Sequence, residues 1–209
     1  MICLADNDIL LKLACCNLLS PLFEALNIPL SEVYHLSTLP YKLADKKLQR
    51  NYGAGAETLR DFLQQIAPMP FNLIPADFEY LNSIEGIDPG EAVLFSSDVS
   101  TPDYLIATGD KRSLKALSAA SGGEFIRERL QERILCLEVA MLHVIRHVGF
   151  EPVRDAVVPV MECDKSMRSA FGSGPLSEQT NVEIALLAYY NELNASTEGM
   201  LFPPPPLEG

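Results

Sequence analysis

The sequence is short of positive charge: its 209 residues include 16 Lys and Arg against 28 Asp and Glu, a formal net charge of −12. This balance excludes a protein held on nucleic acid or anionic lipid mainly by bulk positive charge. The shortage is uneven, because residues 61–110 contain nine acids and no base, and residues 169–209 contain five acids and no base. A local basic surface elsewhere in the chain remains compatible with this total.

Cysteine pairs and long hydrophobic runs are also missing. The five cysteines are odd in number and include no Cys-x-x-Cys pair, which argues against a disulfide framework or a zinc knuckle. No apolar run approaches the roughly 18 residues needed to span a bilayer. The N-terminus has no basic stretch followed by an apolar stretch and a cleavage site. We therefore expect a cytoplasmic protein with reduced thiols and no membrane partner.

Short apolar runs alternate with helical patterns along most of the chain. Strands are predicted at residues 2–5, 32–37, 72–74, 103–108 and 133–138. Helices are predicted at residues 9–22, 41–50, 56–66, 77–84, 92–97, 111–121 and 139–148. The almost wholly apolar run at 103–108 is typical of a parallel strand covered on both faces. The sequence therefore predicts an α/β layer fold with a mainly parallel sheet.

The end of the chain has a different character, so we divide it into an α/β domain at 1–152 and a C-terminal helical extension at 153–209. The extension contains a Gly-Ser-Gly loop at 172–174 and a strong helical pattern at 181–194. Thr180 is the expected cap of that helix, with Glu183 three residues on. Four prolines at 203–206 predict an extended tail.

Three acidic residues follow predicted strands or open predicted helices at the carboxyl edge of the sheet. They are Asp6, Glu91 and Asp110. Ligands of open α/β sheets bind at this edge, near the point where the strand order reverses. Carboxylates that converge there raise one another's pKa, and a hard divalent cation would relieve that repulsion and activate water against a phosphodiester.

A structural interpretation of the same acids stays open. Each lies at a predicted helix N-terminus, where capping and the helix dipole favour acidic side chains. Asp88, Pro89 and Glu91 together match a capping box with proline at the first helical position. The residues alone are compatible with a metal site and with a set of helix caps.

The order of the motifs resembles that of the PIN-domain nucleases. The matching strings, in chain order, are CLADNDILLKLA, IEGIDPGEAVLFSSD and YLIATGDKRSLKAL. Asp6 matches the acid after the first strand, and Asp8 stands where the family usually has Asn or Ser. Gly90-Glu91-Ala92 matches the central helix motif, and Thr108-Gly109-Asp110 matches the third motif. A fourth acid that often follows the third motif is absent here.

The resemblance implies a three-layer α/β/α fold and a Mg²⁺- or Mn²⁺-dependent endoribonuclease that cleaves single-stranded RNA. It assigns Asp6, Glu91 and Asp110 as catalytic residues and metal ligands, with Asp8 as a further ligand. Many PIN-domain proteins are toxins of toxin–antitoxin pairs, so an antitoxin or other protein partner and a homodimer are expected. The missing fourth acid keeps an alternative open, in which a PIN-like fold serves as a weakly active or inactive binding scaffold.

Two small basic clusters are the candidate RNA contacts. The first contains Lys42, Lys46, Lys47 and Arg50, which we expect to form one positive stripe on one helix. The second contains Lys111, Arg112 and Lys115, directly after Asp110. Either cluster can equally be a solvated surface, and in a nuclease both would bind phosphate.

Overall fold

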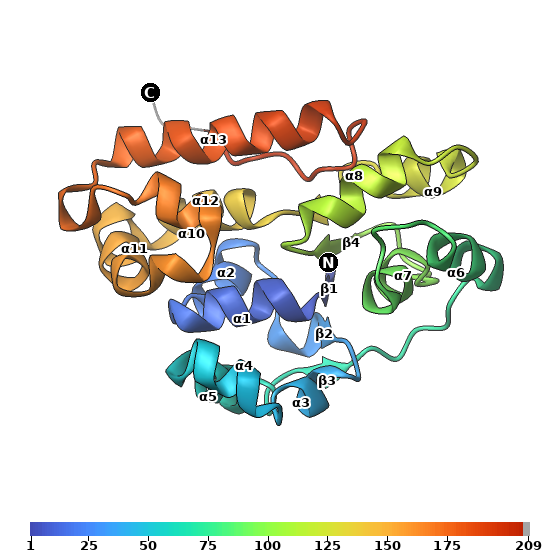
Figure 1. Cartoon of the computed structure of the whole chain (residues 1–209), viewed down its shortest axis with the longest axis horizontal. Coiled ribbons are helices and arrows are strands. Elements are labelled where there is room, and N and C mark those ends of the chain that lie inside the picture. Colours follow the sequence, from blue (N-terminus) through green and yellow to red (C-terminus); the bar gives the residue numbers. More distant parts are fainter. Residues whose placement is uncertain (207–209) are drawn as a thin grey trace.

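The computed structural model describes residues 1–206, and it has the predicted α/β architecture, with a central sheet flanked by helices (Figure 1). The five strands are all parallel and lie in the order β3-β2-β1-β4-β5. Their bounds are β1 Ile2–Ala5, β2 Val33–His35, β3 Ala67–Pro68, β4 Tyr104–Ala107 and β5 Ile134–Leu135. A three-layer α/β/α fold followed by a helical C-terminal segment is therefore confirmed.

Helices connect the strands and make up the C-terminal segment. The α-helices are α1 Asn7–Cys15, α2 Leu19–Ala25, α3 Leu39–Lys42, α4 Lys46–Tyr52, α5 Ala54–Phe62, α6 Pro75–Asn82, α7 Pro89–Phe95, α8 Lys111–Ala119, α9 Glu124–Arg129, α10 Leu137–Val148, α11 Phe150–Val157, α12 Lys165–Ala170 and α13 Gln179–Ala195. Short 3₁₀ turns are η1 Leu30–Glu32, η2 Val158–Cys163 and η3 Gly174–Leu176. None of the helices described is long and apolar enough to cross a membrane.

The strand order reverses between β1 and β4. From β1 the chain builds outward through β2 to β3, and from β4 it builds in the opposite direction to β5. The two central strands pair from Ile2 with Tyr104 to Ala5 with Ala107. The residues that follow Ala5 and Ala107 therefore emerge side by side at the switch point, where open parallel sheets bind their ligands.

Several predicted boundaries differ from the structure for local reasons. The expected helix at 41–50 is broken, because Asp45 caps a new helix by accepting a hydrogen bond from the Lys47 backbone N–H at 2.7 Å. The strand expected at 72–74 is only an isolated antiparallel bridge between Leu73 and Ser97. The third strand is instead Ala67–Pro68, at the edge of the sheet, where proline is tolerated.

The C-terminal segment packs closely on the rest of the chain. Helix α13 lies across α10 and α12 (Figure 1), and the Phe150 and Phe171 rings stack with centroids 6.4 Å apart. The chain after α13 runs beside β5, where the Phe202 N–H donates to the Ile134 carbonyl at 2.8 Å. The predicted Thr180 cap is wrong, because α13 begins at Gln179 and its N-cap position is Glu178.

Candidate functional site

The site lies at the carboxyl ends of β1 and β4. Asp6 directly follows β1, and its backbone N–H donates to the carbonyl of Ala107, the last residue of β4, at 2.8 Å. Asp110 follows β4 after a two-residue turn and caps α8. The sheet therefore brings the acids of the first and third motifs to the same place.

Asp6 is buried at this junction, with 8% of its surface exposed. Its carboxylate caps α1 by accepting a long hydrogen bond from the Asp8 N–H at 3.4 Å. Burial raises the pKa of Asp6 to about 6, backbone N–H groups oppose this rise, and the charges of Asp8 and Asp88 add to it. Burial therefore disfavours the charged form of this carboxylate.

Glu91 is buried as well, with 4% of its surface exposed. It forms the predicted capping box: its Oε2 accepts from the Asp88 N–H at 2.7 Å, while Asp88 Oδ1 accepts from the Glu91 N–H at 2.9 Å. Burial raises the pKa of Glu91 to about 7, and the nearby charges of Asp110 and Asp88 contribute to the rise. Glu91 therefore serves as a helix cap, as the structural interpretation predicts, and it also lies close to other acidic side chains, as the metal-site interpretation predicts.

Asp110 is in a different electrostatic state because Arg112 neutralises it. Arg112 Nη2 lies 2.9 Å from Asp110 Oδ2, and the Arg112 backbone N–H donates to Asp110 Oδ1 at 2.8 Å. Burial would raise the pKa of Asp110, but these bonds outweigh it and hold the pKa below its ordinary value. Arg112 itself is exposed, so this cation can be exchanged for another.

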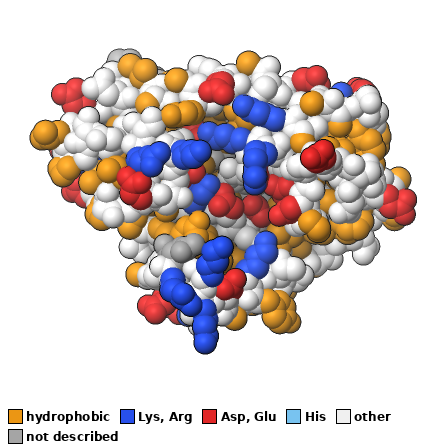
Figure 2. Space-filling model, in the orientation of Figure 1, with side chains coloured by type: hydrophobic (Ala, Val, Ile, Leu, Met, Phe, Trp, Pro, Cys, Tyr) orange, Lys and Arg blue, Asp and Glu red, His pale blue; other side chains and the backbone are white. Residues whose placement is uncertain are grey.

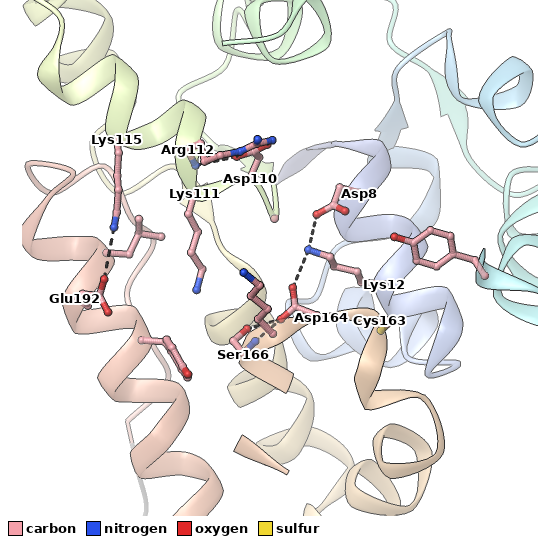
Figure 3. A pocket seen from close by; sticks show the side chains of 15 residues that line it. Asp8, Lys12, Asp110, Lys111, Arg112, Lys115, Cys163, Asp164, Ser166 and Glu192 are labelled. Carbon is pink, nitrogen blue, oxygen red and sulfur yellow. Dashed lines mark hydrogen bonds and ion pairs between the residues drawn. The ribbon is translucent and has the colours of Figure 1, made fainter. Parts of the chain in front are cut away.

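Asp8 is paired with a lysine that also binds the C-terminal segment. Lys12 Nζ lies 2.7 Å from Asp8 Oδ2 and 2.8 Å from Asp164 Oδ2 (Figure 3). Burial opposes the ammonium charge, but the two carboxylates outweigh burial and raise the pKa of Lys12. Lys12 thus links α1 to the N-cap of α12. Both lie near the carboxyl edge of the sheet where Asp6, Glu91 and Asp110 are found, which we call the acidic edge.

The close packing of these groups depends on Gly109 between β4 and α8. A Cβ atom at residue 109 would lie 2.4 Å from Asp8 Oδ2 and 3.3 Å from Lys12 Nζ. Even an alanine here would have to displace the Asp8 carboxylate. The glycine therefore lets the turn before Asp110 approach the first turns of α1.

A cavity of about 560 Å³ opens beside these residues. Its walls come from α1, from the end of α4, from the start of α8 with the turn before it, from α12 with the residues before it, and from α13. A smaller hollow of about 260 Å³ lies between Asp88, Glu91, Asp110 and Arg112. Figure 2 shows acidic side chains gathered in a recess on this face, with Lys and Arg side chains around it.

The acids are neighbours but do not form a closed set of metal ligands. Within residues 1–206, no three His, Cys, Asp or Glu side chains are gathered closely enough to hold a metal ion as they stand. Glu91 faces the Asp88 N–H, Asp8 faces Lys12, and Asp110 faces Arg112. The adjacent Asn7 is buried with no hydrogen-bond partner in the structure for either side-chain polar atom. The site thus combines crowded carboxylates with an unsatisfied amide.

The predicted basic residues have different surroundings. Lys111 Nζ turns to the fully buried Glu138 at 2.6 Å, and Lys115 Nζ lies 3.5 Å from Glu192. With Arg112 they line the larger cavity. Lys42 belongs to α3, whereas Lys46, Lys47 and Arg50 belong to α4, so the expected single helical stripe is wrong. All four of these side chains are exposed.

The structure adds residues to the site that the motifs did not indicate. They are Lys12, Glu138, Asp164 and Lys165. Lys12 follows Asp8 by one helical turn, a spacing that favours ion pairs, so this part of the arrangement carried a signal in the sequence. Asp164 and Lys165 reach the site only through the packing of the C-terminal segment, for which no local pattern gives a sign.

Comparisons with known protein families, with curated proteins and with solved structures found no match to this chain. The structure itself therefore defines the class of the protein: an open parallel α/β sheet with acidic side chains at its switch point, the place where sheets of this kind bind ligands.

Proposed function

We propose that the protein is a metal-dependent endoribonuclease of PIN type that hydrolyses single-stranded RNA. The observation that carries the proposal is the pair of buried carboxylates, Asp6 and Glu91, at the switch point, both with raised pKa values and with Asp110 beside them. Burying a carboxylate is costly without a compensating cation, and the charge of Asp110 raises the pKa of Glu91 further. The order of the three sequence motifs and the topology of the sheet support the same proposal.

The donor chemistry fits Mg²⁺ or Mn²⁺, which prefer carboxylate oxygens and water. Asp6, Glu91 and Asp110 would hold the ion, and Asn7 supplies a further oxygen donor nearby. Asp8 is already neutralised by Lys12 at 2.7 Å, which makes it the weakest candidate ligand of the four acids. When bound, the ion would lower the pKa of a water molecule and offset charge on the phosphate.

The chain's own residues position the substrate in this proposal. Arg112 is exposed, and its guanidinium would become available to a phosphate if a metal ion neutralised Asp110 in its place. Lys115 lines the cavity of about 560 Å³ together with Arg112, and the basic side chains of α3 and α4 are exposed to solvent. These groups would hold the RNA backbone while the acids act on one phosphodiester.

Cleavage of labelled single-stranded RNA in the presence of Mn²⁺ tests the proposal. Wild-type protein is expected to cleave, and Asp6→Asn and Glu91→Gln, purified identically, are expected to lose at least about 100-fold in rate. Arg168→Ala, an exposed change away from the acidic edge, is the control for a contaminating nuclease and for handling. Equal cleavage by wild type and both acid variants would defeat the assignment.

The pH dependence of stability tests the electrostatics without any metal. Asp6 and Glu91 have raised pKa values in the folded state, so the folded protein binds protons more tightly than the unfolded chain between about pH 4 and pH 7. The free energy of unfolding is therefore expected to rise as pH falls from 8 to 5 in EDTA. Burial lowers the pKa of His143, so this one group opposes the rise below about pH 6.5 and makes it smaller than the two acids alone would give. Asp110 and Asp164 have lowered pKa values and oppose it only at still lower pH. Denaturant melts that show falling stability over this range would contradict the account.

A second function, a non-catalytic binding scaffold, is favoured by one observation: each acid already has a structural partner. Asp6 caps α1, Glu91 completes a capping box, and Asp110 caps α8. Thermal melts with millimolar Mg²⁺ or Mn²⁺ separate the two functions, because a ligand that binds only the folded state raises Tm. An unchanged Tm would favour the scaffold.

The biological setting belongs to the same proposal. A cytoplasmic toxin that pairs with an antitoxin, and that forms a homodimer, is the setting in which many proteins of this type act. A small reading frame immediately upstream of the gene would support it, and toxicity on expression that is relieved by that neighbour would test it.

A further inference from the structure

The larger cavity at the acidic edge is built jointly by the α/β core and the C-terminal segment. One wall comes from α1 and α8, and the other comes from α12 and α13. Its volume of about 560 Å³ lies within the range of about 300–1,000 Å³ that is usual for ligand pockets. Five cationic side chains line it, from three helices: Lys12, Lys111, Arg112, Lys115 and Lys165. Four carboxylates line it too, those of Asp8, Asp110, Asp164 and Glu192.

These cations divide into fixed and exchangeable groups. Lys12 is held between two carboxylates, Lys111 is held by Glu138, and Arg112 is paired with Asp110. The pair between Lys115 and Glu192 is exposed on both sides, at 46% and 71% of the side chains, and such pairs contribute little. Lys165 is exposed and has no ion pair within the described part of the chain. A phosphate entering the cavity can therefore recruit Lys115 and Lys165 at small cost.

Two aromatic rings line the same cavity, Tyr52 from α4 and Tyr189 from α13. Tyr189 is half-buried, and the Lys111 ammonium lies 5.0 Å from the centre of its ring. Aromatic rings beside cations are the usual platform for single-stranded nucleic acids, because bases stack on the rings while cations follow the backbone. The cavity combines both elements next to Asp110.

We propose that this cavity binds one nucleotide of single-stranded RNA adjacent to the phosphodiester at the acidic edge, an assignment of substrate that rests on the proposed function. Lys115 and Lys165 hold the phosphate of that nucleotide, and Tyr189 contacts its base. The C-terminal segment is then part of the substrate site and supplies Lys165 and Tyr189 to it.

Fluorescence anisotropy with a short fluorescein-labelled oligouridine in EDTA tests the proposal, because no metal-dependent cleavage occurs there. Lys165→Glu is expected to weaken RNA binding about tenfold. It is also expected to reduce the slope of the log binding constant against log salt concentration by about the contribution of one phosphate contact. Arg168→Glu is the matched control, since Arg168 is also exposed on α12 but does not line the cavity. It is expected to weaken binding by less than about twofold. Tyr189→Ala is expected to weaken binding, and Tyr189→Phe to retain it.

Three results would overturn the proposal: no binding by wild type, equal weakening by Lys165→Glu and Arg168→Glu, or displacement of the RNA by poly-glutamate as readily as by unlabelled RNA. The last result would assign the cavity to an acidic protein. The outcome is separable from that of the cleavage assay. If wild type cleaves RNA but Lys165→Glu does not weaken binding, only the assignment of the cavity is overturned. If Lys165→Glu weakens binding but wild type does not cleave RNA, only the proposed ribonuclease activity is overturned.

Discussion

Glu91→Gln is expected to make the metal-free protein more stable at pH 8 while it abolishes Mn²⁺-dependent RNA cleavage. The buried Glu91 carboxylate has its pKa raised to about 7, so at pH 8 its charged form is present at a cost to the fold. A glutamine keeps the acceptor for the Asp88 N–H in the capping box and removes the charge. The expected gain in the free energy of unfolding is about 1–2 kcal/mol at pH 8, against a loss in cleavage rate of at least about 100-fold.

The two effects of Glu91→Gln separate a functional acid from a structural cap. Chemical denaturation at pH 8 and at pH 5 gives the stability, and the gain is expected to shrink at pH 5, where Glu91 is already protonated. Asp88→Asn, in the same capping box, keeps an acceptor for the Glu91 N–H but also removes a charge that raises the pKa of Glu91. It is expected to stabilise the protein less than Glu91→Gln does and to retain RNA cleavage. A glutamine variant that is less stable than wild type at pH 8 and still cleaves RNA would show that Glu91 serves only the fold.

Lys111→Met is expected to destabilise the protein by about 3 kcal/mol, although Lys111 resembles a surface lysine in the sequence. Its ammonium lies 2.6 Å from Glu138 Oε1, and Glu138 is fully buried with its second carboxylate oxygen unpartnered. Removing one member of such a pair leaves an uncompensated buried charge, which is strongly destabilising. Urea denaturation measures the loss.

A double-mutant cycle identifies the cause. Adding Glu138→Gln to Lys111→Met is expected to recover much of the lost stability, since the isolated charge is then absent. Lys115→Met, one turn further along α8 with an exposed partner, is expected to change stability by no more than about 0.5 kcal/mol. No recovery in the double variant would assign the loss to the packing of Lys111 against Tyr189 and would contradict the ion-pair explanation.

The sequence predicted the centre of the fold well because its signals there are local and strong. The apolar runs of β1 and β4 are each followed by an acidic turn, and the Asp88–Glu91 capping box forms as expected. The strand β3 was missed because it has two residues, one of them Pro68, and is defined only by its pairing with β2. Its existence depends on a partner strand more than on its own composition.

The candidate site was predictable to the extent that the sheet alone determines it. Asp6, Glu91 and Asp110 follow from the carboxyl ends of the strands and from a helix start. The pairing of Lys12 with Asp164 required knowledge of how the C-terminal segment docks on α1, and no spacing in the sequence encodes that contact. The neutralisation of Asp110 by Arg112 depends equally on a side-chain conformation that a motif does not specify.

The most direct measurement of the central claim is a calorimetric titration of the metal-free protein with Mn²⁺ at pH 7.5. We expect saturable binding by the carboxylates at the β1–β4 switch point, accompanied by release of a fraction of a proton from Glu91, whose raised pKa of about 7 leaves it partly protonated at this pH. Binding is expected to be lost in Glu91→Gln. The absence of saturable binding, or equal affinity in wild type and Glu91→Gln, would contradict the account and leave the acids as helix caps.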